Sequence, residues 1–254
     1  MGRPVVVMAG RAKAAVEVAV SEATARRCPV VALVRPADGS VAYPLGVIPE
    51  VVGDDVVGAL VQASATAELL VVARWPGDEN DIERVAAHAA CPVLTVDRIT
   101  TGPGGRAAVV LAVDARARAA TAAAEFAFGE AARRRVDLTV VYVAPAQPGG
   151  GLTTVDPFAY DNGAAMAEAD RLLSEAIVGW SDRYPDVVVH RRAFHDPDVV
   201  KALAVVAADA GLLVVASRDH PRLSERLLGS VTAGVLGHAT CPVAVVPATT
   251  AAER

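Results

Sequence analysis

The stretch His238-Ala239-Thr240-Cys241-Pro242-Val243 repeats, 150 residues further along the chain, the stretch His88-Ala89-Ala90-Cys91-Pro92-Val93. Upstream of each copy, Asp55-Val56-Val57 and Leu69–Ala73 recur at an offset of 143 residues, as Asp198-Val199-Val200 and Leu212–Ala216. The two offsets differ by seven residues, so the first copy is shorter between its last two apolar runs. A repeat of this length predicts two related folding units in one chain.

Length and composition narrow the class of protein. The chain has 254 residues, a net charge of −5, 53% hydrophobic residues and 4% aromatic residues. This length is enough for two cores, while the acidic balance and scarce aromatics argue against nucleic acid as a partner. No apolar run reaches the roughly 18 residues of a membrane helix, and the N-terminus has no signal-peptide layout. We therefore expect no membrane partner. With only three cysteines, an odd number, we expect a cytoplasmic protein without a disulfide framework.

The second copy reads as alternating strands and helices. Continuous apolar runs predict buried strands, and alanine-rich or amphipathic stretches predict helices. The expected strands are 107–113, 138–143, 187–191, 212–216 and 243–246, and the expected helices are 116–135, 164–184, 197–210 (with Asp196 as N-cap) and 230–238. This order predicts an α/β fold with an open five-stranded parallel sheet flanked by helices.

The first copy follows the same order but is shorter. Twenty residues separate Val34 from Asp55, against 54 between Val143 and Asp198. The difference matches the loop and the helix expected at 164–184, so we expect the first copy to lack that helix. The chain therefore divides into a shortened domain at 1–100 and a full-length domain at 106–248, joined by a linker rich in Gly and Thr.

A candidate ligand site follows from the parallel sheet of the second copy. Ligands of such sheets bind outside the carboxyl ends of the strands. Asp114, Val143 and the segment from Ala216 to Val231 converge there. Within that segment Gly229 and Ser230 open the last helix, and free N–H groups at a helix start suit a phosphate. The alternative, a helix capped by the Ser230 hydroxyl beside a solvated loop, fits these residues equally well.

Here the chain resembles a known family. The segments Leu227–Val231, Ala239–Val243 and Val113-Asp114 are similar to those of the universal stress protein (UspA) family, and the resemblance extends over both copies, in outline for the first. It implies a tandem two-domain member. Because the family commonly pairs through its last strands, the resemblance also implies that residues 93–96 lie beside 243–246, as a pseudo-dimer within one chain.

Many members of that family bind ATP through a loop patterned Gly-x-x-Gly, nine residues, Gly-Ser/Thr. Its positions fall here on Ala216, Asp219, Gly229 and Ser230, so only the last part matches. Asp219 puts a negative charge beside a polyphosphate, at a cost of order one to several kcal/mol unless Arg218 or a metal ion offsets it. By the same resemblance Asp114 and Val143 would hold the adenosine end. The adenosine end is thus retained and the phosphate end is damaged.

The first copy departs further from the nucleotide-binding pattern. Ala9 stands at the counterpart of Asp114, and Glu79-Asn80 at the counterpart of Gly229-Ser230. Carboxylates at this helix start can cap it themselves and would repel phosphate. We expect this copy to bind no nucleotide.

Three functions remain open. The first is a non-catalytic stress-response regulatory or interaction protein with no resident cofactor, acting as a homodimer or with a protein partner; the second is an ATP or AMP sensor working through the second domain. The third is an adenylyl-transferring enzyme, which we do not expect because the chain lacks His-x-Gly-His and Ser-Gly-Gly-x-Asp-Ser motifs. The cluster His195–Asp198 fits a strand end followed by a helix cap, and the two His-x-x-Cys pairs fit a helix's last turn and a buried thiol better than a metal site.

Overall fold

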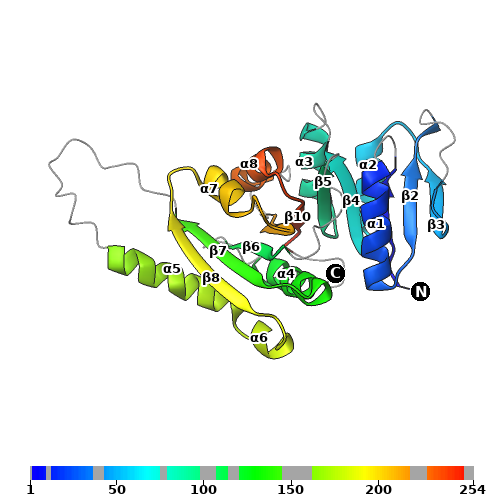
Figure 1. Ribbon diagram of the computed structural model, residues 1–254. Helices are drawn as coiled ribbons and strands as arrows, with labels where there is room; N and C mark the ends of the chain where they lie inside the picture. The colour runs from blue at the N-terminus through cyan, green and yellow to red at the C-terminus, as the bar shows by residue number, and fades with distance from the viewer. Residues whose placement is uncertain are drawn as a thin grey trace, which may run out of the picture.

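A computed structural model describes residues 2–9, 13–36, 43–74, 79–97, 107–113, 120–144, 162–217 and 228–248 (Figure 1). The first half of the chain contains β1 (Val5–Met8), α1 (Lys13–Arg26), β2 (Val30–Val34), β3 (Val47–Val51), α2 (Val56–Ser64), β4 (Leu69–Arg74), α3 (Glu79–His88) and β5 (Val93–Asp97). The second half contains β6 (Val109–Val113), α4 (Ala120–Arg134), β7 (Leu138–Ala144), α5 (Asn162–Ile177), α6 (Trp180–Arg183), β8 (Val189–His195), α7 (Val199–Val206), β9 (Leu212–Ala216), α8 (Ser230–His238) and β10 (Val243–Val246).

The ten strands form one sheet in the order β3-β2-β1-β4-β5-β10-β9-β6-β7-β8. Within each half the strands are parallel and follow the same third-second-first-fourth-fifth order. The halves meet where β5 and β10 pair antiparallel, with Val93 opposite Val245 and Thr95 opposite Val243. This is the pairing of last strands expected from the sequence. We refer to β5, β10 and the helices that flank them as the seam.

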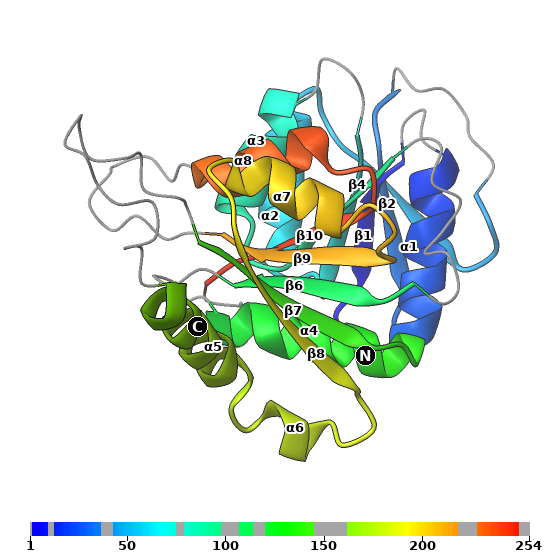
Figure 2. The same ribbon diagram turned by 60° about the vertical axis from the view of Figure 1, so that its left-hand side comes forward.

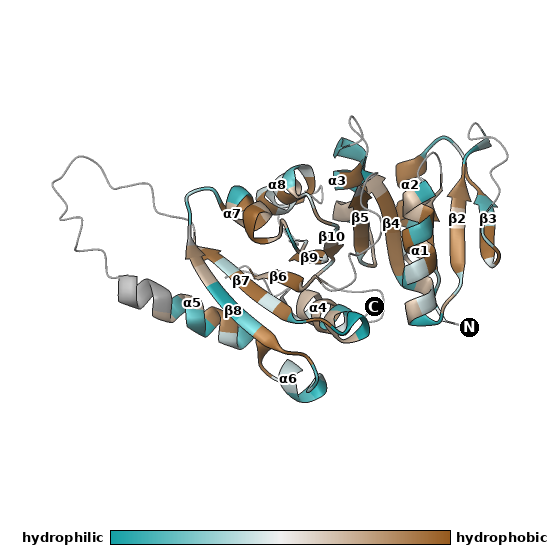
Figure 3. Ribbon diagram, in the orientation of Figure 1, coloured by the Kyte–Doolittle hydropathy of each residue, from teal (hydrophilic) through white to brown (hydrophobic). Residues whose placement is uncertain are grey.

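Helices cover both faces of the sheet, and each face has its own core. One core packs α1, α4 and α5 against the sheet, and the other packs α2, α3, α7 and α8 (Figure 2). Adjacent residues of one strand serve opposite cores, as Val5 and Val6 do. Strands buried on both faces need continuous apolar runs, which explains the runs in the sequence. The central strands are accordingly mostly hydrophobic, whereas the outer strand β8 and helix α5 carry hydrophilic residues (Figure 3).

The first half lacks a helix that the second half has. Between β2 and β3 the described residues, 35–36 and 43–46, form no α-helix, whereas α5 and α6 lie between β7 and β8. The shortening expected from the spacing is confirmed. As a consequence, the outer strand β3 is mostly exposed, and Leu45, Ile48 and Val51 are large apolar side chains in contact with solvent.

Three local expectations need correction. Gly179, at a φ of +78°, ends the helix expected at 164–184 and divides it into α5 and α6; this left-handed conformation costs a residue without a Cβ little. The strand expected at 187–191 is β8, displaced to Val189–His195. The N-cap of α7 is Asp198 rather than Asp196, because Asp198 Oδ1 accepts from the Lys201 N–H at 3.0 Å. Asp55, its counterpart in the repeat, caps α2 in the same way.

A buried ionic cluster joins the halves on the α1–α4 side of the seam. The Arg26 guanidinium donates to Glu22 on its own helix and to Glu130 on α4. Arg134 does the reverse, with 2.9 Å to Glu130 and 2.8 Å to Glu22. Arg133 also donates to Glu130. The Glu130 side chain is 1% exposed, so its charge is removed from water and depends on these arginines.

The cluster repeats itself across the seam. Glu22 and Arg26 stand 108 residues before Glu130 and Arg134, and each pair closes one turn of its own helix. At the same offset, Arg27 and Arg135 end their helices at left-handed φ values of 55° and 54°. The four side chains therefore form a reciprocal quartet, which fits only if the two helices are related by an approximate two-fold axis.

The arginines around Glu130 set the protonation of its carboxylate. Burial by itself would raise the pKa of Glu130, but the positive charges of Arg26, Arg133 and Arg134 outweigh it and hold that pKa below its ordinary value. A lowered pKa in the folded state means that the ionised carboxylate stabilises the fold above the pKa of the unfolded chain. That stabilisation is lost as the pH falls through the lower, folded-state pKa.

We therefore expect Glu130→Gln to lower the free energy of unfolding at pH 7 by about 3 to 5 kcal/mol, because it leaves buried guanidiniums without their anion. The difference from the parent should narrow as the pH falls through the lowered pKa of Glu130. Urea denaturation between pH 7 and pH 3 measures both effects. Glu17→Gln, at an exposed pair with Lys13, is the control and should change nothing measurable. A difference that stays constant down to pH 3 would contradict the lowered pKa.

Candidate functional site

The carboxyl ends of the second half's strands meet at one edge of the sheet. Val113 lies beside Tyr142 and Ala216 beside Val246 in the strand registers, and Val143 follows Tyr142 directly. The Ser217 N–H donates to the Val246 carbonyl at 2.8 Å, which extends the β9–β10 pairing past the strand ends. Of the residues expected at this site, the structure places Val143, Ala216, Gly229, Ser230 and Val231; Asp114, Arg218 and Asp219 lie outside the described residues.

Helix α8 starts at this edge. Gly229 is its N-cap in extended conformation, and among the described residues no side chain caps the helix. Ser230 is the first helical residue and is exposed, so the alternative in which its hydroxyl caps the helix is wrong. Val231 is half-buried and packs against the core. Free N–H groups, a close-packed glycine and an exposed hydroxyl are what a phosphate group needs.

A contact that the sequence did not suggest fixes the start of α8. The Thr232 hydroxyl donates to the carbonyl of Ala216 at 3.2 Å. It thereby joins the first turn of α8 to the end of β9, the two ends of the segment expected to bind a ligand. The sequence shows only a threonine three residues after Gly229, which by itself favours no particular partner. The structure adds that this threonine is buried.

The middle of α8 packs closely on α7. A Cβ atom built on Gly234 would lie 2.6 Å from Cγ2 of Val200 and 3.0 Å from its Cγ1. One turn later, a Cβ on Gly237 would meet nothing within 4 Å. The middle of α8 therefore lies as close to α7 as a glycine permits, and this packing fixes the position of the helix.

The equivalent helix of the first half, α3, starts with negative charge. Glu79 is its first residue and Asp81 lies in the same turn. Their negative charges neutralise the partial positive charge of the helix N-terminus, and they would repel a phosphate there. Ala9, at the counterpart of Asp114, is buried with 2% exposure and offers only a methyl group. The two halves thus differ most at the helix start that would face a ligand.

The cysteines and histidines of the repeated motif have structural environments. Burial raises the pKa of Cys91 to about 12 and also raises that of Cys241, so neither thiol is ionised at neutral pH. Nδ1 of His88 lies 2.8 Å from the Arg84 carbonyl, and that of His238 lies 2.8 Å from the Gly234 carbonyl, one turn back on the same helix. Among the residues that the structure describes, His, Cys, Asp and Glu side chains form no group of three able to hold a metal ion.

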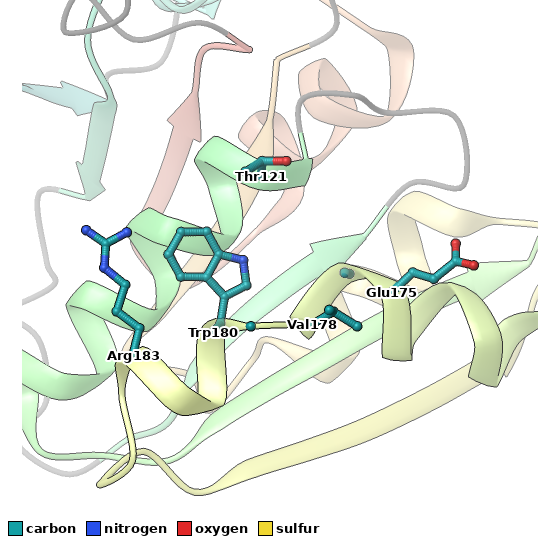
Figure 4. Close-up of a pocket in the computed structure, with 7 residues that line it drawn as sticks. Thr121, Glu175, Val178, Trp180 and Arg183 are labelled. Carbon is teal, nitrogen blue, oxygen red and sulfur yellow. The ribbon is translucent and has the colours of Figure 1, made fainter.

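A cavity of about 320 Å³ lies between α4, α5 and α6, away from the expected site. Thr121 stands above the Trp180 ring, with Arg183 on one side and Val178 and Glu175 on the other (Figure 4). Its charged groups already have partners within the chain: Arg183 pairs with an exposed glutamate of α4 at 3.1 Å, and Glu175 with an arginine of α5. The Trp180 ring stacks on aromatic neighbours on α4 and after α6. We interpret the cavity as a packing feature of α6.

None of the helices in the described part of the chain is long and apolar enough to cross a membrane.

Comparison with known proteins decides the family. The model of the universal stress protein family matches residues 106–247. A universal stress protein of Mycobacterium tuberculosis is 32% identical over 215 residues, which cover 80% of this chain and 69% of the relative. The chain belongs to the universal stress protein family. A relative from Mycolicibacterium smegmatis is likewise 32% identical over 212 residues, 80% of this chain and 70% of its own.

Solved structures agree on the fold. The chain is similar to a universal stress protein from Archaeoglobus fulgidus with a TM-score of 0.64 and 15% identity, covering 97% of each chain. A putative universal stress protein from Pseudomonas aeruginosa gives 0.62 and 17%, covering 96% of this chain and 93% of that one. At these identities the similarity concerns the arrangement of the two halves and not their ligands.

The packing of α8 yields a matched pair of substitutions. Gly234→Ala should lower the free energy of unfolding by about 1 to 3 kcal/mol, because the stiff, branched Val200 side chain cannot move aside easily. Gly237→Ala, on the same helix in open space, should raise it by up to about 1 kcal/mol through helix propensity. Thermal melting of the two variants measures both. Equal shifts in the two variants would show that α8 does not lie this close to α7.

Proposed function

We propose that this universal stress protein is a non-catalytic stress-response regulatory or interaction protein whose nucleotide site is degenerate in the first half and partly degenerate in the second. The proposal includes a shortened domain at 1–100, a full-length domain at 106–248 and no resident cofactor. It rests on the difference in charge and capping between the N-termini of the two equivalent helices, α3 and α8.

The observation that carries the proposal is the contrast between α3 and α8. Each opens after the fourth strand of its half, where a parallel sheet of this order takes its ligands. Two carboxylates, Glu79 and Asp81, occupy the first turn of α3, whereas the first turn of α8 has none. An anionic ligand is therefore repelled at the first position and tolerated at the second.

The second half keeps only part of a nucleotide site. Gly229 and Ser230 retain the end of the family's phosphate loop, while the sequence places Asp219 and Ala216 where its two earlier glycines stand. The negative charge of Asp219 weighs against a polyphosphate. In this proposal Asp114 and Val143 would hold an adenosine, with Arg218 and Val231 beside the phosphates.

A specific observation favours the alternative, an ATP or AMP sensor working through the second half. Among the described residues the Ser230 hydroxyl has no hydrogen-bond partner, and none of their side chains caps α8. A phosphate could accept hydrogen bonds from both the hydroxyl and the helix N-terminus. The N-terminus of α8 favours phosphate binding and therefore the sensor, whereas the charge of Asp219 disfavours it and supports the main proposal. The two proposals differ in which effect is larger.

The absence of catalysis is supported by the state of the reactive side chains. The acidic residues of the His195–Asp198 cluster serve the backbone: Asp198 caps α7, and Asp196 accepts from the Asp198 N–H at 2.8 Å. The thiols of Cys91 and Cys241 are buried with raised pKa values. These groups stabilise helices and cores rather than activate a nucleophile.

The partner in this proposal is a second copy of the chain or another protein, bound over the exposed side of β3. Ile48 and Val51 are 51% and 73% exposed, and because they are three residues apart on β3 they lie on opposite faces of this edge strand. Exposed apolar side chains on an edge strand are typical of interaction surfaces. We expect a dimer in sedimentation velocity that dissociates in Val51→Lys. A monomer at all concentrations would contradict the homodimer and leave a different protein as the partner.

The nucleotide site is tested by isothermal titration with ATP and AMP, with and without Mg²⁺. We expect the parent chain to bind ATP with a dissociation constant above about 1 mM. Asp219→Gly should tighten binding tenfold or more, since it removes a like charge beside the phosphates. Glu79→Gln removes a carboxylate from the start of α3 in the first half and should not change ATP binding.

Micromolar binding by the parent would overturn the proposal and establish the sensor. Binding that appears in Glu79→Gln would show that the first half retains a site that only the charges at the start of α3 had blocked. Binding only after Asp219→Gly would show a degenerate site on an intact frame.

A further inference from the structure

Helix α8 is held at its far end by a residue of the other half. The Nη1 atom of Arg74, at the end of β4, donates to the carbonyls of Leu236 at 3.1 Å and Ala239 at 2.8 Å, and its Nη2 atom donates to that of Cys241 at 3.1 Å. These carbonyls belong to the last turn of α8 and the turn into β10. A helix leaves its last carbonyls without partners inside the helix, and a cation there also opposes the negative end of the helix dipole.

The sheet registers explain how Arg74 reaches so far. Arg74 lies beside Asp97 in the β4–β5 pairing, and continuing the β5–β10 register places Cys241 opposite Asp97. The guanidinium therefore crosses one strand to reach the second half. The distance along the chain, 162 to 167 residues, conceals this contact from any local analysis of the sequence.

Among the residues that the structure describes, this contact has no equivalent in the opposite direction. The counterpart of Arg74 in the repeat is Ser217, whose side chain is too short to cross a strand. The quartet on the α1–α4 side is reciprocal, whereas the Arg74 contact on the α3–α8 side acts only from the first half upon the second. Arg74 directly follows Ala73, whose counterpart in the second half is Ala216. The family's phosphate loop begins at the position of Ala216.

We propose that Arg74 is a positioning residue through which the first half holds α8, so that the shortened half acts as a clamp on the helix whose start is the candidate site. The start of α8 is fixed by Thr232 within the second half and its middle by Gly234 against α7. The first half holds its C-terminal end through Arg74 and also packs α3 against α8. Releasing Arg74 frees this end and lets α8 open without unfolding the sheet.

Amide hydrogen exchange of the full-length chain, without nucleotide, tests the clamp. In Arg74→Met, which keeps most of the aliphatic stem and removes the guanidinium, the amides of residues 233–241 should exchange about tenfold faster than in the parent. Peptides from α4 should be unchanged. Arg74→Lys keeps the charge but not the fork of two Nη groups, and should fall between the two.

Arg3→Met is the matched control. Arg3 also donates to carbonyls that end a helix, those of Ala65 at 2.8 Å and Thr66 at 3.3 Å after α2, but it lies in the same half as that helix. Its substitution should accelerate exchange at the end of α2 and leave α8 unchanged.

Unchanged exchange in α8 of Arg74→Met would overturn the proposal. So would an equal acceleration in every element, because Arg74 would then contribute only to global stability. The proposal rests on the proposed function only in taking the start of α8 as the candidate site. Because the measurement uses no nucleotide, failure to bind ATP leaves the clamp standing, and failure of the clamp leaves the titration result standing.

Discussion

The reciprocal pairing of Glu22 and Arg26 with Glu130 and Arg134 determines how the two halves can meet. Two carboxylates and two guanidiniums withdrawn from water are stable only with their partners in place, so sliding or rotating one half would leave a buried charge uncompensated. The apolar strands β5 and β10 supply buried area, and the buried Thr95 hydroxyl favours their register by donating to the Val243 carbonyl at 3.2 Å. The ionic quartet reinforces that preference.

Much of this fold follows from the sequence because its signals are local. The apolar runs mark strands buried on both faces, and the repeated segments mark two halves with the same strand order. The missing helix follows from a difference in spacing. The errors were also local: Gly179 breaks a helix whose apolar spacing continues past it, and Asp198 caps α7 although Asp196 precedes a proline that also fits a helix start.

The side-chain contacts across the seam, unlike the pairing of β5 with β10, could not be predicted, since both partners of each contact read as ordinary local features. Glu130 and Arg134 resemble an exposed pair on a charged helix turn, and Arg74 resembles the end of a strand. Their significance depends on which surfaces the tertiary fold brings together. For the candidate site, the sequence indicated Gly229 and Ser230, but Thr232 and Arg74 emerge only once the ends of α8 are placed.

The antiparallel seam also explains why a residue at the carboxyl edge of the first half meets the C-terminal end of α8. Strands of the two halves run in opposite directions, so the carboxyl ends of β1 and β4 lie at the same edge of the sheet as the amino ends of β9 and β10. Helix α8 starts at the carboxyl edge of its own half and must finish at the amino edge, where β10 begins. Arg74 at the end of β4 is therefore directed at the C-terminus of α8, about 13 Å along the helix from Ser230. In a pseudo-dimer of this geometry, the first half therefore has a side chain within reach of the second half's helix α8.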